Sequence, residues 1–298
     1  MTRVVSIVNM KGGVAKTTTT IMLAEFLAGE LGKRVLLLDV DPQISLTIAL
    51  VGEEKWMQAH QAGRTMSTLF AEEIDDPAER TWDAPKSILR NASNVRAVTE
   101  VDLLPSSPNV LRMQGQLTAM AMASRGSRDP DTILRDGLQP VVDDYDYVLI
   151  DCPPSMDGLT MNALRMSEAY LIPTVPDVLS TYGIPMIQEY VKEFAEDAEF
   201  DAPHELGLVL TKFQRNSKVH WTTIQKLNSN PSLPELLEPW VPQSNDIAAA
   251  AEFKEYSTLT VKYGQTHVRT LSGLARTFHD RVESLPEPDG LEGDRADD

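Results

Sequence analysis

The chain has 298 residues, of which 42% are hydrophobic and 24% are charged, an ordinary composition for a folded domain. Its net charge of −17 excludes a surface that is basic throughout but leaves room for a local basic patch. The single cysteine, Cys152, excludes a disulfide framework and a multi-cysteine metal site. No apolar run approaches the roughly 18 residues of a membrane span. We therefore expect a cytoplasmic protein that does not enter a membrane.

Strands and helices alternate along the chain. In chain order, apolar runs and helical periodicity predict a strand at 3–9, a helix at Thr17–Leu31, strands at 32–41 and 101–107, helices at 108–123 and 130–143, strands at 145–155 and 169–175, a helix at 180–196, a strand at 205–211, a helix at 217–228, a strand at 239–242 and a helix at 266–285. This order predicts βαβ units and an α/β fold with a doubly wound, mostly parallel sheet covered by helices on both faces.

Two parts of the chain lack a clear pattern. Residues 52–100 are polar and weakly periodic, so we expect irregular structure there, as an acidic insertion or an adaptor contact site. Residues 286–298 are acidic and contain glycine and proline, which predicts a disordered tail. We treat residues 1–285 as one domain.

The segment "NMKGGVAKTTTT" (9–20) lies between the first strand and the first helix, where a phosphate loop would lie. The strict Walker A pattern has glycine six positions before its lysine and glycine directly before it. Here those positions hold Met10 and Ala15, and the loop carries an additional lysine, Lys11. A positive φ at Ala15 would cost about 1 kcal/mol.

The residues that remain are those that phosphate binding needs. Gly12 and Gly13 let the backbone approach a phosphate, whose charge suits a helix N-terminus. Lys16 supplies a positive charge for the β- and γ-phosphates, and Thr17 offers a hydroxyl to Mg²⁺. The alternative is a glycine-rich turn capped by threonines.

Two later motifs place carboxylates at the ends of buried strands. They are "LLLDVDPQ" (36–43) and "YVLIDCPPS" (147–155), and ligands of open α/β sheets bind at such strand ends. Asp151 would hold Mg²⁺ through water, Asp39 would support that shell, and Asp41 would position the attacking water. The alternative is that these acids cap the following helices.

These motifs together resemble one family. "KGGVAKTTTT", "LLLDVDPQISLT", "LLPSS", "YVLIDCPPSMDGLTMNAL" and "LIPTVPDVLSTYG" are similar to the deviant Walker A ATPases of the ParA/MinD class, most of all to Soj-like ParA partition proteins. The resemblance covers about residues 3–50 and 100–285. It implies ATP and Mg²⁺ as cofactors, weak intrinsic ATP hydrolysis and a homodimer in the ATP state. Lys11 would be the signature lysine, reaching the partner subunit's phosphates as a finger in trans.

The resemblance also implies a set of site residues. The nucleotide would be bound by Lys11, Gly12, Gly13, Val14, Ala15, Lys16, Thr17, Thr18 and, beside the adenine, Pro242; catalysis would fall to Lys11, Lys16 and Asp41, and the metal to Thr17, Asp39 and Asp151.

ParA-like proteins hold DNA without sequence preference through basic residues, and phosphate contacts suffice for that. The candidates are Lys212, Arg215, Lys218, Lys254 and Lys262, with Arg269 as a further one. Arg215 matches one family position up to a one-residue gap, and the other family position holds Asp246 instead of arginine. The alternative is that these are scattered solvated charges.

Several related classes of ATPase and ligase can be considered as alternatives. Iron–sulfur ATPases need cysteines for a cluster, which one cysteine cannot supply. MinD-like positioning ATPases end in a membrane-binding helix, but "THVRTLSGLARTFHDRVESL" (266–285) is only mildly basic and leads into an acidic tail, which favours docking on the core. A ligase of the dethiobiotin-synthetase type would need an acceptor pocket and would not need Lys11. A further alternative is a switch that binds ATP and scarcely hydrolyses it.

Our hypothesis is a ParA-like ATPase whose slow hydrolysis is stimulated by a ParB-like or other adaptor. It would position a plasmid, a chromosome or a protein assembly, and it would associate with the nucleoid if it binds DNA.

Overall fold

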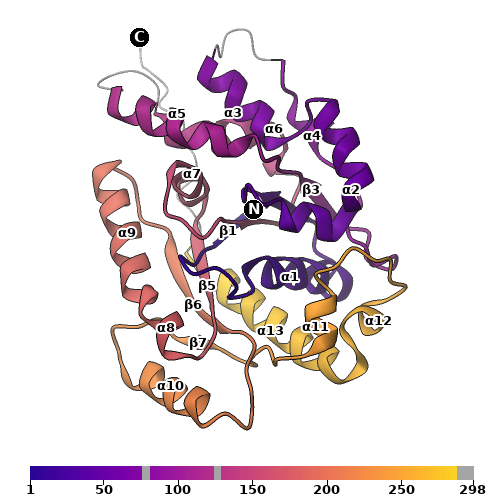
Figure 1. Cartoon of the computed structure of the whole chain (residues 1–298), viewed down its shortest axis with the longest axis vertical. Helices are drawn as coiled ribbons and strands as arrows, with labels where there is room; N and C mark the ends of the chain where they lie inside the picture. The colour runs from indigo at the N-terminus through magenta and orange to yellow at the C-terminus, as the bar shows by residue number, and fades with distance from the viewer. Residues whose placement is uncertain (76–80, 124–128, 287–298) are drawn as a thin grey trace.

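A parallel sheet forms the centre of the computed structural model, which describes residues 1–75, 81–123 and 129–286. The seven strands have the order β3-β2-β4-β1-β5-β6-β7, and all neighbours are parallel. They are β1 (Arg3–Ile7), β2 (Val35–Asp39), β3 (Val101–Leu104), β4 (Tyr147–Asp151), β5 (Ala169–Thr174), β6 (His204–Leu210) and β7 (Leu236–Leu237). The sheet with helices on both faces (Figure 1) confirms the predicted doubly wound α/β fold.

Alternate side chains along each strand enter two separate cores, as period-2 geometry requires. Val5 and Leu37 belong to one cluster, whereas Leu36 and Val148 belong to the other. Four of the five inner strands, β1, β2, β4 and β5, are almost wholly buried. Continuous apolar runs are therefore typical of these strands.

One face of the sheet is covered mainly by α1 (Lys16–Leu31) and α13 (Gln265–Glu283), which pack against each other. Buried residues of α13, including Leu271, Leu274 and Phe278, join the core beneath α1. The helix at 266–285 therefore docks on the core, as the sequence predicted. In Figure 1, α11 (Asn245–Ala249) and α12 (Leu259–Tyr263) lie beside this pair.

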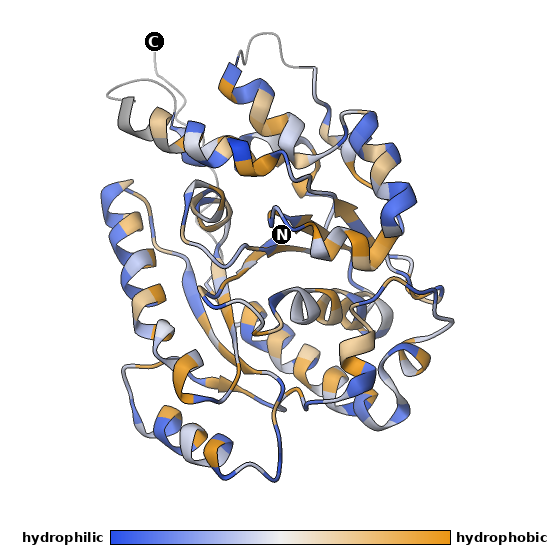
Figure 2. Cartoon of the chain, in the orientation of Figure 1, coloured by the Kyte–Doolittle hydropathy of each residue, from blue (hydrophilic) through white to orange (hydrophobic). Residues whose placement is uncertain are grey.

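Most of the opposite face is covered by another set of helices. They are α5 (Val110–Ala123), α6 (Ile133–Val142), α7 (Gly158–Met166), α9 (Gly183–Asp197) and α10 (Lys218–Ser229), with the short α8 (Val178–Thr181) and the 3₁₀ turn η2 (Pro130–Thr132). Bands of hydrophobic and hydrophilic residues alternate along these helices (Figure 2), as expected for helices with one buried face. No helix in the described ranges is both long enough and apolar enough to cross a membrane.

The expectation of irregular structure at 52–100 is wrong for three helical stretches. Helix α2 (Ser45–Gln61) continues past Gly52, where φ is 74° and the helix kinks, and α3 (Met66–Asp75) follows. A shorter helix, α4 (Ala84–Ser87), comes later. The second half of α2 is mostly polar, so its helical residues produce almost no apolar periodicity.

The strand predicted at 239–242 has the wrong bounds, since β7 is Leu236–Leu237. These two residues pair with Leu208 and Val209 of β6. Pro239 has no N–H to donate and interrupts the regular ladder. Backbone contacts resume beyond it, where the Val241 N–H donates to the Leu210 carbonyl at 2.8 Å and Pro242 forms an isolated parallel bridge with Phe213. The tail predicted from 286 onward lies, apart from Pro286, outside the described residues.

Candidate functional site

The loop from Asn9 to Ala15 joins β1 to α1 at the carboxyl edge of the sheet. Gly13 has φ of 77°, and Ala15 lies in the left-handed region with φ of 66° and ψ of 37°. A non-glycine residue in this region carries about 1–2 kcal/mol of strain. Helix α1 has no side-chain cap at its N-terminus, so its first N–H groups are free to bind an anion.

Asn9 organises the loop from inside. Its side chain accepts a hydrogen bond from the Lys11 N–H at 2.9 Å and donates one to the Pro173 carbonyl at 2.8 Å. Its own carbonyl accepts one from the Lys16 ammonium at 3.1 Å. Burial lowers the pKa of Lys16, and the carboxylate of Asp151 opposes this shift. The hydrogen bond to the Asn9 carbonyl holds Lys16 at the base of the loop, where the carboxylate of Asp151 only partly offsets the effect of burial on its charge.

The register of the sheet brings two predicted acids side by side. Asp151 of β4 pairs with Asp39 of β2 on one side and with Ile7 of β1 on the other. The end of β1 leads into the loop from Asn9 to Ala15, so both acids lie beside that loop. Both side chains are almost completely buried.

Hydrogen bonds hold each acid in place. Asp151 accepts from the Thr17 hydroxyl at 2.7 Å and from the Thr20 hydroxyl at 3.3 Å. Asp39 accepts from the Thr47 hydroxyl at 2.6 Å and from the Thr47 N–H at 2.9 Å.

The two acids have unusual pKa values. Burial, and then the charge of Asp151, raise the pKa of Asp39 to about 8. Burial raises the pKa of Asp151 to about 7, although the Thr17 hydroxyl and the Lys16 ammonium act in the opposite direction. Two carboxyls that resist ionisation at one edge form a site that a cation would stabilise.

Asp41 lies just past β2 and is mostly buried. It accepts a hydrogen bond from the Gln43 N–H at 2.8 Å, and its own N–H donates to Asp39 at 3.2 Å. Both interactions fix the turn after β2. The alternative that Asp41 caps the following helix does not hold, because α2 has Ile44 at its N-cap position and no side-chain cap.

A cavity of about 240 Å³ lies beside the N-terminus of α1. Its lining includes the apolar residues Met22, Pro242 and Ile247 and the polar residues Thr18 and Gln243. The predicted residues Ala15, Thr18 and Pro242 therefore come together at one cavity with a mixed apolar and polar lining.

A family model described as an AAA domain matches residues 2–202. The chain is 29% identical over 228 residues to the sporulation initiation inhibitor protein Soj of Bacillus subtilis, which covers 76% of this chain and 79% of Soj. The chain belongs to the ParA/MinD class of P-loop ATPases. The resemblance predicted from the sequence motifs is thereby confirmed.

Solved structures share the fold of this ParA/MinD-class chain. A plasmid partition protein from Borrelia burgdorferi bound to AMPPNP superimposes with a TM-score of 0.68 at 20% identity, over 94% of this chain and 100% of that one. The cobyrinic acid a,c-diamide synthase of Mycobacterium smegmatis, with an ATP analogue and magnesium bound, gives 0.64 at 24% identity, over 84% and 91%. At these identities the likeness extends to the fold alone.

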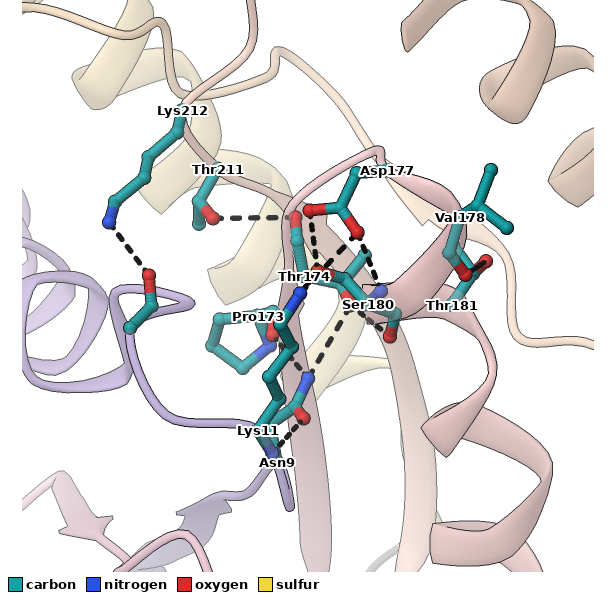
Figure 3. A network of polar contacts seen from close by, with 11 residues as sticks. Asn9, Lys11, Pro173, Thr174, Asp177, Val178, Ser180, Thr181, Thr211 and Lys212 are labelled. Atoms are coloured by element: carbon teal, nitrogen blue, oxygen red, sulfur yellow. Dashed lines mark hydrogen bonds and ion pairs between the residues drawn. The ribbon is translucent and has the colours of Figure 1, made fainter. Parts of the chain in front are cut away.

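The Lys11 side chain folds back onto its own chain. Its ammonium donates to the Ser180 hydroxyl at 2.8 Å and lies 3.4 Å from Asp177 (Figure 3). Asp177 also accepts from the Ser180 N–H at 2.7 Å and caps α8. The Lys11 side chain remains 40% exposed, so it is held at the surface by contacts within its own chain.

The structure places the residues predicted to contact DNA in different environments. Lys262 is wholly buried, and its ammonium donates to Glu25 and Asn94 at 2.8 and 2.7 Å. The prediction that Lys262 contacts DNA is wrong for this fold, because the ammonium is enclosed in the core. Lys212 reaches the phosphate loop, where it donates to the Gly13 carbonyl at 2.7 Å.

The other basic candidates lie on the surface. Arg215 and Lys218 are exposed near the start of α10, and Arg269 is exposed on α13. Lys254 is also exposed, with its ammonium 5.7 Å from the centre of the Tyr256 ring.

The sequence motifs did not single out Asn9, Asp177, Ser180 and Thr211 as site residues. Asn9 was the easiest to find, because it stands at the end of β1 directly before the loop. Asp177 and Ser180 stand in "VPDVLSTYG", a quoted family motif. Their contact with Lys11 depends on β1 and β5 being neighbours in the sheet.

Proposed function

We propose that this chain is a ParA-like ATPase that binds ATP and Mg²⁺, dimerises around the nucleotides and hydrolyses ATP slowly. The observation that carries the proposal is the row formed by Thr17, Asp151 and Asp39 beside a loop with two lysines, Lys11 and Lys16. The row supplies oxygen donors for a divalent cation, and the lysines supply charge for a polyphosphate.

The donor set fits magnesium held jointly with a nucleotide. No group of three or more His, Cys, Asp or Glu side chains in the described ranges is arranged to hold a metal by itself. Mg²⁺ keeps several waters and is usually bound through one or two protein oxygens plus substrate phosphates. Thr17 would be the direct ligand, while Asp151 and Asp39 would act through water. Bound Mg²⁺ neutralises charge on the phosphates.

The protein's own residues then have separate tasks. The free N–H groups of α1 and the Lys16 ammonium bind and orient phosphate oxygens, because both are fixed by the fold before a ligand arrives. Asp41 holds a water near the end of β2. The apolar slot at Pro242 takes the adenine and excludes solvent from it.

Lys11 connects the site to a second subunit. Its contacts with Asp177 and Ser180 are partly exposed, so they cost little to exchange for contacts with a partner's nucleotide. In the ATP dimer each Lys11 leaves its own subunit's α8 and reaches across the interface. Hydrolysis returns the protein to separate subunits, and an adaptor of the ParB kind accelerates that step.

We include non-specific DNA binding in the proposal on the strength of one local feature. Residues 206–234 contain Lys212, Arg215, Lys218 and Lys226 and no acidic residue, although the chain carries a net charge of −17. A basic segment on an acidic protein directs phosphate contacts to one surface. Such binding would associate the ATP form with the nucleoid.

Lys11→Ala tests the core of the proposal. We expect wild-type protein with ATP to elute as a dimer in size-exclusion chromatography with light scattering. Lys11→Ala should remain a monomer and lose hydrolysis, while Asp41→Ala should trap the dimer. Lys192→Ala, which removes a lysine whose side chain is 74% exposed on α9, is the matched control. Full turnover by Lys11→Ala would favour a ligase-type enzyme and refute the proposal.

DNA binding has its own test. A gel shift with non-specific duplex should show ATP-dependent binding at low salt, and Arg215→Ala with Lys218→Ala should weaken it, unlike Lys192→Ala. Lack of binding at low salt with ATP would remove the nucleoid part and leave the ATPase part intact.

A further inference from the structure

We propose that Lys212 is a positioning residue for the phosphate loop, and this inference rests on the proposed function. Lys212 follows β6 and adopts the left-handed region with φ of 50°. From there its side chain crosses to the loop and donates to the Gly13 carbonyl at 2.7 Å (Figure 3). A lysine in this conformation is uncommon.

The preceding residue makes a matching contact. The Thr211 hydroxyl donates to the Val14 carbonyl at 2.9 Å. Two consecutive side chains at the end of β6 therefore hold two consecutive carbonyls of the phosphate loop. Thr211 is buried between β5 and the loop, whereas Lys212 closes the outer side.

Because each peptide group is planar, these two contacts also fix the direction of the N–H groups in the loop. In a trans peptide the C=O and the following N–H point in opposite directions. Holding the Gly13 and Val14 carbonyls toward β6 directs the N–H groups of Val14 and Ala15 away from it. Across the described residues, neither of these N–H groups donates to another residue. They are therefore oriented and free to bind an anion.

The loop needs this support because the glycine at position 13 does not restrict its own backbone conformation. Gly13 has φ of 77°, and no atom of the described residues outside its chain neighbours lies within 4 Å of the position that a Cβ would occupy, so its own conformation does not hold the Gly13–Val14 peptide in one orientation. A flipped peptide would present the carbonyl in place of the N–H to a bound phosphate. The Lys212 ammonium opposes that flip through a charge-assisted hydrogen bond. It also adds a third positive charge, besides Lys11 and Lys16, at the loop.

The test compares phosphate recognition with base recognition. Affinities of ATP and of adenosine would be measured by displacement of a fluorescent ATP analogue, whose own affinity is measured for each variant. We expect Lys212→Met to weaken ATP binding about 3- to 10-fold, the range for one hydrogen bond. Adenosine binding should change less than about 2-fold. Lys212→Arg should recover most of the ATP affinity, and Lys192→Met should match the wild type.

Two results would overturn this inference alone. One is wild-type ATP affinity in Lys212→Met, and the other is an equal loss of ATP and adenosine, which a general disturbance of the pocket would produce. If wild-type protein bound no ATP, the proposed function would fail, and this inference would fail with it.

Discussion

Replacing Lys262 with methionine should destabilise the protein strongly. Its ammonium lies 2.8 Å from Glu25, and both side chains have no exposed surface. Removing one partner of a buried ion pair costs about 3–5 kcal/mol, because the remaining charge is left without compensation. Glu25 keeps hydrogen bonds from the Tyr263 and Ser93 hydroxyls at 2.8 and 2.7 Å. We therefore expect a loss near the lower end, about 3 kcal/mol.

Urea unfolding followed by circular dichroism measures this loss. With an m-value of about 3 kcal/mol/M for a chain of this size, the midpoint of Lys262→Met should fall by about 1 M. Adding Glu25→Gln should recover much of the loss, because the uncompensated charge is then removed. Lys192→Met, which removes an exposed lysine, should leave the midpoint unchanged. An unaltered midpoint in Lys262→Met, together with weaker DNA binding, would refute the buried placement and restore the sequence-based prediction.

Three further predictions concern the loop, the metal and pH. Ala15→Gly should stabilise the protein by up to about 1 kcal/mol in urea unfolding, since the relief of left-handed strain exceeds the entropy cost of glycine; a destabilised variant would contradict the strain. Thr17→Ala should abolish the effect of Mg²⁺ on ATP affinity in calorimetric titrations with and without EDTA; retained Mg²⁺ dependence would exclude Thr17 as the ligand. Burial and the nearby Asp129 raise the pKa of Asp131 from 3.8 to about 6, so the folded state binds this proton more tightly than the unfolded state, and stability falls as pH rises from about 4 through about 6. Asp131→Asn should therefore be more stable than wild type by about 1 kcal/mol at pH 7, where partial exposure of the carboxyl reduces the effect, and equally stable at pH 4. An equal gain in stability at both pH values would contradict the raised pKa of Asp131.

The sequence alone determined the architecture and the central motif. Buried parallel strands leave nearly continuous apolar runs, as in 36–38 and 147–150, and such runs are visible without a structure. The order of strands and helices then predicted the doubly wound sheet. Lys16, Thr17, Asp39 and Asp151 followed from the same pattern, because parallel strands place their carboxyl ends at one edge.

The sequence did not reveal helices whose residues show no apolar periodicity. The second half of α2 is polar on most sides, and α3 follows a short turn, so 52–75 read as irregular. Periodicity reports burial of one face, and a helix that buries only a few side chains produces little of it.

Only the tertiary structure decided what the individual lysines do. Lys212, Arg215 and Lys262 are alike as basic residues in a sequence, yet one holds the phosphate loop, one is exposed and one is paired inside the core. The partner of a long side chain is fixed by contacts between segments far apart in the chain, such as Glu25 with Lys262 or Gly13 with Lys212. Local pattern carries no record of those contacts, because they depend on which strands and helices become neighbours.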